Sequence, residues 1–370
     1  MQTEKKCLIS FFNTRSGRFK WWDQFPMSLK KRLATYDVDC HYFYKSQTSQ
    51  SLFRKDEILI NPERSGDGSL GNDKWLLDNV WPIMEKYKQV IIHTHSYHPP
   101  FKLRKLIKKH GSATWVTTIH RCPVRSTAPL IRLYKILLRR FHYLPDWYIG
   151  VSHATSGYIK HNFGNSRVKT IHNGIDLSSP IVRKNWPKQN QTDNKRFLFV
   201  NRLDKGKGLE LLVEAVPLIL KSNRNFFLTI VGDGPFKSSV EKLISDCAAS
   251  NLSFEGHRSD VEYFYSSHDV LLIPYTRPQG LSLVSIEARS HGLPAIYTSM
   301  GGVTETRDNT NGIEMKDATV EALVSAIKEI ETTSSFEELV NGCYIGLDYF
   351  SMERMVREYC DFYMSLTAVP

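Results

Sequence analysis

The chain has 370 residues, of which 41% are hydrophobic and 24% charged, as in soluble globular proteins. It contains no run of about 18 uncharged apolar residues, so we expect no membrane-spanning helix. The start, MQTEKKCLISFF, lacks the apolar core and cleavage site of a secretory signal. The six cysteines are scattered without a C-x-x-C pair, which favours reduced thiols in a cytoplasmic protein over disulfides or a zinc framework.

The net charge of +11 is unevenly distributed along the chain. Residues 1–200 hold 34 Lys and Arg against 14 Asp and Glu, whereas residues 201–370 hold 15 against 24. Charge asymmetry of this kind bears on partners rather than on fold. The basic half therefore favours an anionic partner, such as nucleic acid, phospholipid head groups or a phosphorylated acceptor.

Short apolar, β-rich segments alternate with helical patterns along the whole chain. The predicted strands of the first half are KCLISFF, DCHYFYK, QVIIHTH, ATWVTTIH, DWYIGVS and RVKTIHNG. Those of the second half are RFLFVNRL, FFLTIVGDG, LSFEGH, DVLLIPY and LPAIYTS. Residues 209–221 and 235–250 carry apolar residues at the three- and four-residue spacing of helices, and a helical, acidic tail covers 350–366. This alternation predicts mostly parallel sheets covered on both faces.

The alternation occurs twice, and the polar segment 182–196 between the two sets is typical of a linker. We therefore predict an α/β protein with two Rossmann-like domains, over 1–185 and 186–350, that face each other across a cleft. Ligands are expected at the carboxyl ends of the strands, where this architecture places its binding crevice.

Two motifs in the first half have ordinary explanations. GDGSLG (66–71) matches the dinucleotide pattern G-x-G-x-x-G, but it follows a polar run instead of a strand, and no acidic residue closes the next strand. We favour a flexible loop there over a nicotinamide or flavin site. The pair Asp37 and Asp39 matches the D-x-D of metal-dependent sugar transferases, although a turn before a strand is the preferred interpretation.

Three histidines, His93, His95 and His98, lie together at the end of a predicted strand. His93 and His95 share a strand face, so zinc ligation is one interpretation, but no carboxylate or cysteine nearby completes a ligand set. Polar lining of the cleft and structural histidines with satisfied hydrogen bonds are the alternatives. We favour cleft lining and expect no metal.

Cations and glycines follow two strands of the second half. Arg202 comes just after a strand and Lys207 just before a helix, so two charges and the free N–H groups of a helix start combine into an anion site. Taken alone, this segment is better explained by two solvated surface cations. Gly232 and Gly234 follow the next strand and permit a tight backbone path close to a ligand.

A third segment, Gly280, Leu281 and Ser282, leads directly into a helix that contains Glu287. We expect the N–H groups of this segment to meet a phosphate, while Glu287 accepts two hydrogen bonds from a ribose diol. Alternatively, Glu287 pairs with a structural arginine, because a buried carboxylate without a partner is costly.

Taken together, these segments resemble the retaining glycosyltransferases of the GT-B fold, specifically family 4. NRLDKGKG is similar to the family's G-R-L-x-x-x-K-G segment, which implies that Arg202 and Lys207 bind the diphosphate. QGLSLVSIEA is similar to E-G-x-G-L-x-x-x-E-A, which implies that Glu287 is the ribose ligand. SMGGVTETRDNTNG (299–312) resembles the family's G-G-x-x-E…N-G stretch.

The resemblance extends to the first half. TTIHRC is similar to the T-x-H-D segment whose histidine lines the reaction site, which implicates His120. VSHAT (151–155) and HNGID (172–176) also fit. The tail, 351–370, is similar to the helix that crosses back onto the N-terminal domain of the family.

The chain departs from the family pattern at four places. Gln279 occupies the position of the first Glu in E-x7-E, Arg121 follows His120 where Asp is usual, Ser282 replaces a glycine, and the first loop has the single glycine Gly17. A glutamine can orient a sugar hydroxyl but cannot place a negative charge near the anomeric carbon. We expect Gln279 to suit a different donor sugar; a slow or silent relative is the alternative.

The resemblance implies sugar transfer from a UDP- or GDP-linked donor to an acceptor hydroxyl, with retention of configuration and without a metal or other cofactor. Arg202, Lys207 and the amides near Leu281 would stabilise the charge on the departing phosphate. His120 and Gln279 complete the predicted catalytic set, and Gly232, Gly280, Ser282 and Glu287 the donor-binding set. The predicted acceptor-side residues are Arg15, Gly17, His95 and Asn173.

Two basic segments of the first half bear on the acceptor. Residues 101–111 carry five Lys and Arg, and 128–144 set cations and apolar residues on separate helical stripes. A basic amphipathic helix can rest on an anionic bilayer, and a crossover helix with a solvated face is the alternative. We expect a cytoplasmic enzyme, peripheral on the inner membrane face, acting on a lipid-linked, lipopolysaccharide or polysaccharide precursor.

Rival functions remain open. A nucleotide-sugar epimerase shares the two-domain fold, and a catalytically silent binder of sugar nucleotides would retain the donor site. Nucleic acid is not an expected partner, because no recognition motif accompanies the basic charge. No feature of the sequence indicates an oligomeric state.

Overall fold

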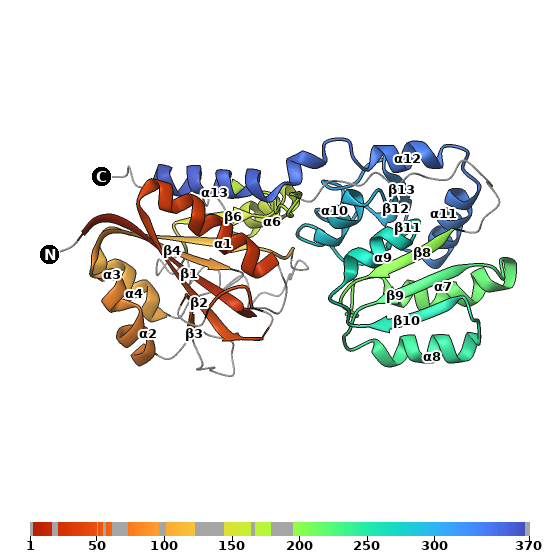
Figure 1. The fold of residues 1–370 in the computed structure, drawn as a ribbon, viewed down its shortest axis with the longest axis horizontal. Coiled ribbons are helices and arrows are strands. Elements are labelled where there is room, and N and C mark those ends of the chain that lie inside the picture. The colour runs from red at the N-terminus through yellow and green to blue at the C-terminus, as the bar shows by residue number, and fades with distance from the viewer. Residues whose placement is uncertain are drawn as a thin grey trace. The chain divides into compact units, whose positions relative to one another are not determined.

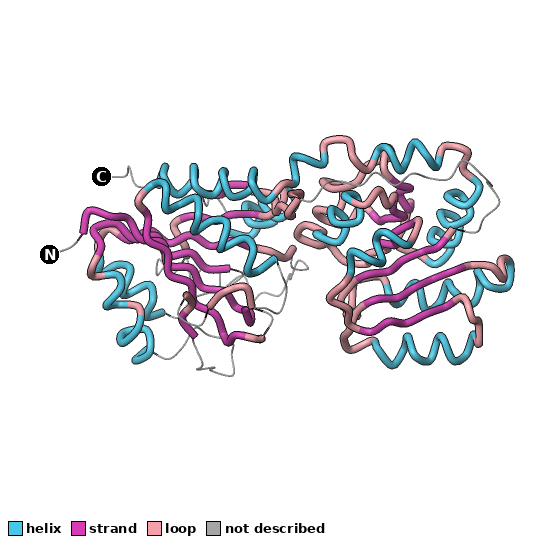
Figure 2. Tube along the Cα trace, viewed as in Figure 1, coloured by secondary structure: helices cyan, strands magenta, loops and turns pink. Residues whose placement is uncertain are grey.

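The structure is a computed structural model, and it describes residues 3–16, 21–49, 51–54, 57–60, 73–95, 101–122, 144–163, 167–178 and 195–366. The chain divides into two compact units. The N-terminal unit comprises Met1–Gly174 and Met352–Pro370, and the C-terminal unit comprises Ile175–Ser351. Each unit is built on one parallel sheet with helices packed against it (Figure 1, Figure 2).

The N-terminal unit contains a seven-stranded sheet in the order β3-β2-β1-β4-β5-β6-β7. Its strands are β1 (Thr3–Ser16), β2 (Val38–Gln47), β3 (Leu59–Ile60), β4 (Tyr87–His95), β5 (Ala113–Ile119), β6 (Trp147–Gly150) and β7 (Val168–Thr170). Its helices are α1 (Trp21–Leu33), η1 (Ala34–Tyr36), α2 (Asp73–Asn79), α3 (Trp81–Met84), α4 (Phe101–His110), α6 (His153–Phe163) and α13 (Met352–Ser365). All of its strand pairs are parallel, so consecutive strands are joined by crossover connections and not by tight hairpins.

Helix α13 joins the N-terminal unit although it follows the last element of the C-terminal unit in the chain. It packs along α1, as Figure 1 shows. Arg354 donates from Nη2 to the carbonyl oxygen of His172 at 2.8 Å. The backbone N–H of Gly174 points to Met355 Sδ at 3.2 Å. These contacts fasten the tail beside the segment that contains Asn173.

The C-terminal unit contains a six-stranded sheet in the order β10-β9-β8-β11-β12-β13. Its strands are β8 (Arg196–Val200), β9 (Phe227–Val231), β10 (Leu252–Gly256), β11 (Val270–Ile273), β12 (Ala295–Thr298) and β13 (Gly312–Met315). Its helices are α7 (Leu209–Ser222), α8 (Lys237–Cys247), α9 (Val261–Ser267), α10 (Leu283–Ser290), α11 (Val320–Thr332), α12 (Phe336–Gly342) and η2 (Leu347–Phe350).

Both faces of the C-terminal sheet are buried, because alternate residues of one strand enter two different apolar clusters. Phe197 and Phe199 of β8 belong to the cluster with α7, α8 and α11. Leu198 and Val200 belong to the cluster with α9 and α10. A strand that is buried on both faces needs apolar residues at consecutive positions, and β8 has them at 197–200.

The predicted α/β class with two Rossmann-like units is confirmed. The sequence does not predict β3 or β13, since β3 has only two residues and β13 contains one β-branched residue among Gly, Glu and Met. The motif at 66–71, His98, Gly17 and most of 128–144 and 182–196 lie outside the described residues. Among the helices of the described residues, none has the length and apolarity needed to cross a membrane.

Candidate functional site

The predicted donor-site residues lie in loops that leave the carboxyl ends of the C-terminal strands. Arg202 and Lys207 lie between β8 and α7, Gly232 follows β9, and Gln279 lies between β11 and α10. Because the strands are parallel, their carboxyl ends share one edge of the sheet. The fold therefore gathers residues that are up to about eighty positions apart in sequence.

Glycines allow these loops to approach one another. Gly208, at the start of α7, has a φ of +82°, and a Cβ at this position would lie 1.9 Å from the carbonyl oxygen of Pro274. Gly232 has a φ of +146°, and its Cβ would lie 1.8 Å from the carbonyl oxygen of Asn201. Neither position can accept a side chain without moving backbone, so the loop geometry depends on glycine.

Lys207 and Gln279 are brought into direct contact. Lys207 Nζ donates a hydrogen bond to Gln279 Oε1 at 2.7 Å. The same ammonium lies 4.8 Å from the centre of the Tyr275 ring. A cation over an aromatic face is stabilised by the ring's quadrupole. The ammonium is thus held from two sides, by an amide oxygen and by an aromatic ring.

Tyr275 is a central residue of the site that the sequence did not indicate. It is 2% exposed and lies just after β11. Its hydroxyl accepts a hydrogen bond from Asn201 Nδ2 at 2.8 Å and lies 3.1 Å from Ser282 Oγ. It therefore links the β8–α7 loop to the start of α10. The available signal was a tyrosine at the end of the buried strand segment DVLLIPY.

Helix α10 begins at the segment predicted to bind phosphate. Ser282 is its N-cap, and the Ser282 hydroxyl accepts from the backbone N–H of Ser285 at 3.3 Å. The replacement of the usual glycine by Ser282 therefore supplies a helix cap. Gly280 is buried and Leu281 is half-buried, directly before this cap.

Glu287 lies on the second turn of α10 and is half-buried. Its Oε2 accepts a hydrogen bond from the hydroxyl of Tyr265 at 2.9 Å. Burial, and then the charge of Glu287, raise the pKa of Tyr265 well above its usual value, so the phenol stays protonated and donates. A carboxylate has several acceptor positions, so this contact leaves Glu287 able to receive further donors.

Two buried arginines, Arg289 of α10 and Arg307 after β12, bind backbone carbonyls. The guanidinium of Arg289 donates to the carbonyl oxygens of Cys343, Thr306 and Ile345. Arg307 donates to the carbonyl oxygens of Ser285, Leu293 and Asn311. Burial lowers the pKa of Arg307 to about 10, which leaves it charged. These arginines anchor α10 and the loops around it through backbone carbonyl oxygens.

Arg202 lies at the surface. Its Nε pairs with Asp204 Oδ2 at 3.3 Å, and its side chain is 53% exposed. An exposed ion pair contributes little stability and exchanges readily with other ions. Arg202 is therefore free to turn towards an anion, but it does not share the contacts that hold Lys207.

His120, predicted to be catalytic, and His95, predicted to lie on the acceptor side, belong to one cluster in the N-terminal unit. His95, the last residue of β4, is hydrogen-bonded through Nδ1 to Nε2 of His120, which follows β5, at 3.0 Å. Phe12 stacks on His95 with ring centres 4.4 Å apart, and Trp22 meets His120 edge-on at 4.9 Å. The two histidines therefore lie together, at the carboxyl ends of neighbouring parallel strands.

His93 connects this cluster to α13. Its Nδ1 is hydrogen-bonded to the hydroxyl of Tyr363 at 2.6 Å, and its Nε2 to Thr118 Oγ1 at 2.7 Å. Burial lowers the pKa of both His93 and His120 to about 3, and that of His95 well below its usual value. The cluster is therefore neutral at physiological pH, and both ring nitrogens of His93 have protein partners.

The other acceptor-side candidates are less well defined. Asn173 is buried, and its Oδ1 has no hydrogen-bond donor among the described residues. Arg15 belongs to β1, and its side chain is not described. Asp37 ends η1 in the left-handed conformation, and Asp39 accepts a hydrogen bond from the hydroxyl of Tyr87 at 2.8 Å. Asp37 thus lies in the turn before β2, whereas Asp39 belongs to β2 itself.

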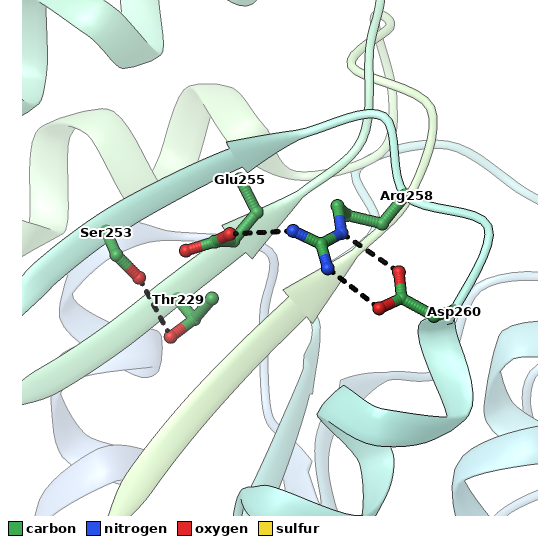
Figure 3. Close-up of polar contacts among 5 residues, drawn as sticks. All are labelled: Thr229, Ser253, Glu255, Arg258 and Asp260. Carbon is green, nitrogen blue, oxygen red and sulfur yellow. Dashed lines mark hydrogen bonds and ion pairs between the residues drawn. The ribbon is translucent and has the colours of Figure 1, made fainter.

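A second polar cluster lies across β9 and β10 (Figure 3). Ser253 donates to Thr229 Oγ1 at 3.0 Å, and Arg258 donates to both oxygens of Asp260, at 2.9 and 2.7 Å. Arg258 also reaches Glu255 at 3.5 Å. The cluster braces the loop after β10. Gly256, the last residue of β10, accepts a hydrogen bond from Gly232 N of the glycine turn at 2.7 Å.

Comparisons with known proteins agree with this arrangement. The profile of the family described as "Glycosyl transferases group 1" matches residues 194–332, and that of "Glycosyltransferase Family 4" matches 25–179. An uncharacterised glycosyltransferase of Methanocaldococcus jannaschii is 28% identical over 191 residues, 48% of each chain. A GDP-mannose-dependent α-(1-6)-phosphatidylinositol monomannoside mannosyltransferase of Mycobacterium tuberculosis is 31% identical over 141 residues, covering 35% of this chain and 37% of that protein. The chain thus spans about half, or less, of the length of these two relatives.

Solved structures share the fold over the whole length. A glycosyltransferase of Rickettsia africae matches with a TM-score of 0.75 at 18% identity and covers 100% of both chains. HepE of Anabaena in complex with UDP-glucose matches with a TM-score of 0.70 at 16% identity, covering 97% of this chain and 99% of that one. The fold is therefore GT-B, and the chain belongs to the family 4, or group 1, glycosyltransferases.

Proposed function

We propose that the protein transfers a sugar from a nucleoside diphosphate sugar to a hydroxyl of a glycan acceptor, with retention of configuration and without a metal. The observation that carries this proposal is the Lys207 ammonium, held beside the capped start of α10 with Glu287 one turn further along. A cation and free helix N–H groups suit a diphosphate, and a carboxylate suits a ribose diol.

The donor is bound by the C-terminal unit in this proposal. Lys207, Arg202 and the amides near Leu281 hold the diphosphate, and Glu287 holds the ribose. HepE of Anabaena binds UDP-glucose, and the mycobacterial relative is named for GDP-mannose, so a UDP- or GDP-linked sugar is the expected donor. As the glycosidic bond breaks, negative charge develops on the β-phosphate, and preorganised donors stabilise it.

The acceptor side is assigned to the N-terminal unit. His95 and His120 provide neutral imidazoles that can hydrogen-bond a sugar hydroxyl without carrying charge. The acceptor hydroxyl attacks the anomeric carbon from the face on which the phosphate leaves, and the leaving phosphate takes the hydroxyl proton. This front-face route is proposed because no residue of the sequence stands out as the nucleophile of a double displacement. Gln279, in this scheme, adds no negative charge to the donor site.

The acceptor is proposed to be a lipid-linked, lipopolysaccharide or polysaccharide precursor at the cytoplasmic membrane face. Helix α4 supports this, because Lys105, Lys108 and Lys109 are exposed on it. Lys109 lies 4.0 Å above the ring of Trp81, which places a cation beside an aromatic residue, as at membrane interfaces. Anionic lipid would attract such a surface.

The test is a panel of UDP-, GDP- and ADP-sugars, with nucleoside diphosphate release measured with and without polyprenyl-linked or lipid-linked glycan acceptors. One donor is expected to support acceptor-dependent release, and Glu287→Ala is expected to weaken binding of that nucleotide. Conversion of the donor sugar without acceptor would indicate an epimerase instead. Tight donor binding with no turnover would indicate a silent relative, and no binding of any nucleotide would overturn the proposal.

A further inference from the structure

Gln279 is fixed on both its backbone and its side chain. Its carbonyl oxygen accepts from Gly302 N at 3.0 Å, and a Cβ on Gly301 would lie 2.2 Å from that oxygen. Its Nε2 donates to the carbonyl oxygen of Arg277 at 2.9 Å, while its Oε1 accepts from Lys207. The side chain therefore has a single, defined position.

One of these two side-chain contacts needs a hydrogen-bond acceptor and the other a donor, and an amide supplies both. The ammonium of Lys207 can only donate, and the carbonyl oxygen of Arg277 can only accept. A residue between them must present one acceptor and one donor, and a glutamine does both. A glutamate would turn a second acceptor oxygen towards the Arg277 carbonyl, at a distance where two oxygens repel, and would form an ion pair with Lys207.

The neutral amide of Gln279 also affects how the charge of Lys207 can be used. Gln279 and the Tyr275 ring hold the ammonium through neutral groups, so its positive charge is not cancelled by these partners. A carboxylate at the same distance would cancel that charge locally and compete with an incoming anion for the same donor hydrogens. The neutral amide thus orients the cation and keeps it available.

We propose that Gln279 is a positioning residue for Lys207, and that its neutral amide reserves the lysine charge for the diphosphate of the donor. Restoring the glutamate of the family pattern is then harmful in this chain. This inference rests on the proposed function, because it assumes that Lys207 meets a diphosphate. It assigns to Gln279 a role through Lys207 rather than a contact with the anomeric centre.

The experiment compares Gln279→Glu with wild type, by calorimetric titration of UDP, UMP, GDP and GMP. In Gln279→Glu, affinity for the preferred nucleoside diphosphate is expected to fall by about 10-fold or more. The reason is that Lys207 pairs with the new carboxylate, so the diphosphate loses one hydrogen bond from a charged donor. Affinity for the matching monophosphate is expected to fall much less. In the truncated variant Gln279→Ala, which adds no charge, affinity for the diphosphate is expected to fall only a few-fold.

Two further variants separate positioning from general charge. Lys205 is an exposed lysine two positions from Lys207, so Lys205→Glu changes the local charge by twice as much without touching the contact. It is expected to change diphosphate affinity less than Gln279→Glu does. In the Lys207→Ala background, Gln279→Glu is expected to have a clearly smaller effect than in wild type.

The outcomes are distinguishable. If wild type binds a nucleoside diphosphate and Gln279→Glu binds it equally well or better, the positioning role is wrong and the proposed function stands. If Lys205→Glu weakens binding as much as Gln279→Glu, the effect is general charge, and the positioning role is again wrong. If wild type binds no nucleoside diphosphate, both proposals fail. Thermal unfolding of each variant shows whether it is folded. If Gln279→Glu is not folded, Gln279→Ala replaces it in the comparison with wild type.

Discussion

The side chains of the histidine cluster in the N-terminal unit and of the lysine site in the C-terminal unit are held in place by different means. His93, His95 and His120 are held by burial and by hydrogen bonds between side chains, and burial removes their charge. Lys207 is held by neutral partners and placed by loops whose close approach depends on glycine, at Gly208 for example. Neutral groups suit a polar hydroxyl, whereas an ammonium group suits a phosphate.

The comparison also separates what each region tolerates. A buried neutral histidine is sensitive to pH, because protonation favours the unfolded state. A glycine-dependent loop is sensitive to any added side chain, because its backbone leaves no room for a Cβ. An exposed polar cluster such as that of Arg258 depends on neither, and should be the most tolerant of the three.

Replacing Lys207 with alanine is expected to give the largest effect. Loss of one preorganised donor to the leaving phosphate lowers kcat by about 10²–10³-fold. The measurement is steady-state turnover of the donor identified by the panel, and Lys205→Ala, which removes a nearby exposed lysine, is the matched control. Equal turnover in Lys207→Ala and Lys205→Ala would show that the lysine site is not catalytic.

Replacing Gly208 with alanine is expected to destabilise the C-terminal unit. The φ of +82° and the contact with Pro274 O together predict a loss of about 2–4 kcal/mol in the free energy of unfolding. Urea unfolding followed by far-ultraviolet circular dichroism measures this loss. Gly157→Ala is the control, because Gly157 lies inside α6 with nothing within 4 Å of its Cβ position and should be neutral or stabilising. A similar loss in both variants would argue against a special backbone at Gly208.

Lowering the pH is expected to weaken the N-terminal unit through its histidines. The pKa of His93 is lowered from 6.5 to about 3, so between these values the unfolded chain binds a proton that the folded unit excludes. Stability then falls with decreasing pH by up to about 1.4 kcal/mol per pH unit for one such group. In His93→Gln this contribution is absent, so the stability of the variant should fall less steeply from pH 6.5 to 4.5.

Tryptophan fluorescence is a suitable probe of that pH dependence, because six of the seven tryptophans belong to the N-terminal unit. Parallel stability profiles for wild type and His93→Gln would contradict the expectation. Such a result would mean that His93 is protonated, or solvated, in the folded unit.

Removing the Arg258 side chain is expected to give the smallest effect. Its pairs with Asp260 and Glu255 are exposed to solvent, and ion pairs of this kind contribute little to stability. Arg258→Ala should therefore leave the thermal midpoint within a few degrees of wild type. A large loss of stability, or of nucleotide affinity, would show that the brace after β10 matters for the glycine turn beside it.

Much of the fold followed from local sequence patterns. Eleven predicted strands correspond to strands of the structure, because apolar β-rich runs between helical patterns identify buried parallel strands. The residues at the carboxyl ends of these strands, such as Lys207 and Gly232, were located for the same reason. Strand β3 has only two residues, and β13 has one β-branched residue among Gly, Glu and Met, so neither shows a strand pattern.

The contacts that define the sites did not follow from the sequence. Lys207 and Gln279 are 72 positions apart, and His93 and Tyr363 are 270 apart. No periodicity relates such pairs, since packing of separate elements brings them together. Tyr275 was missed because a tyrosine at a strand end is ordinary in a core, and only its partners reveal its role.

The most direct test of the account is amide hydrogen exchange, measured with and without the preferred nucleoside diphosphate. Exchange is predicted to slow in residues 201–210 and 274–287, where the lysine site and the start of α10 lie, and to stay unchanged in residues 113–120 around His120. Protection confined to the N-terminal unit, or protection nowhere in the chain, would contradict the assignment of the donor site.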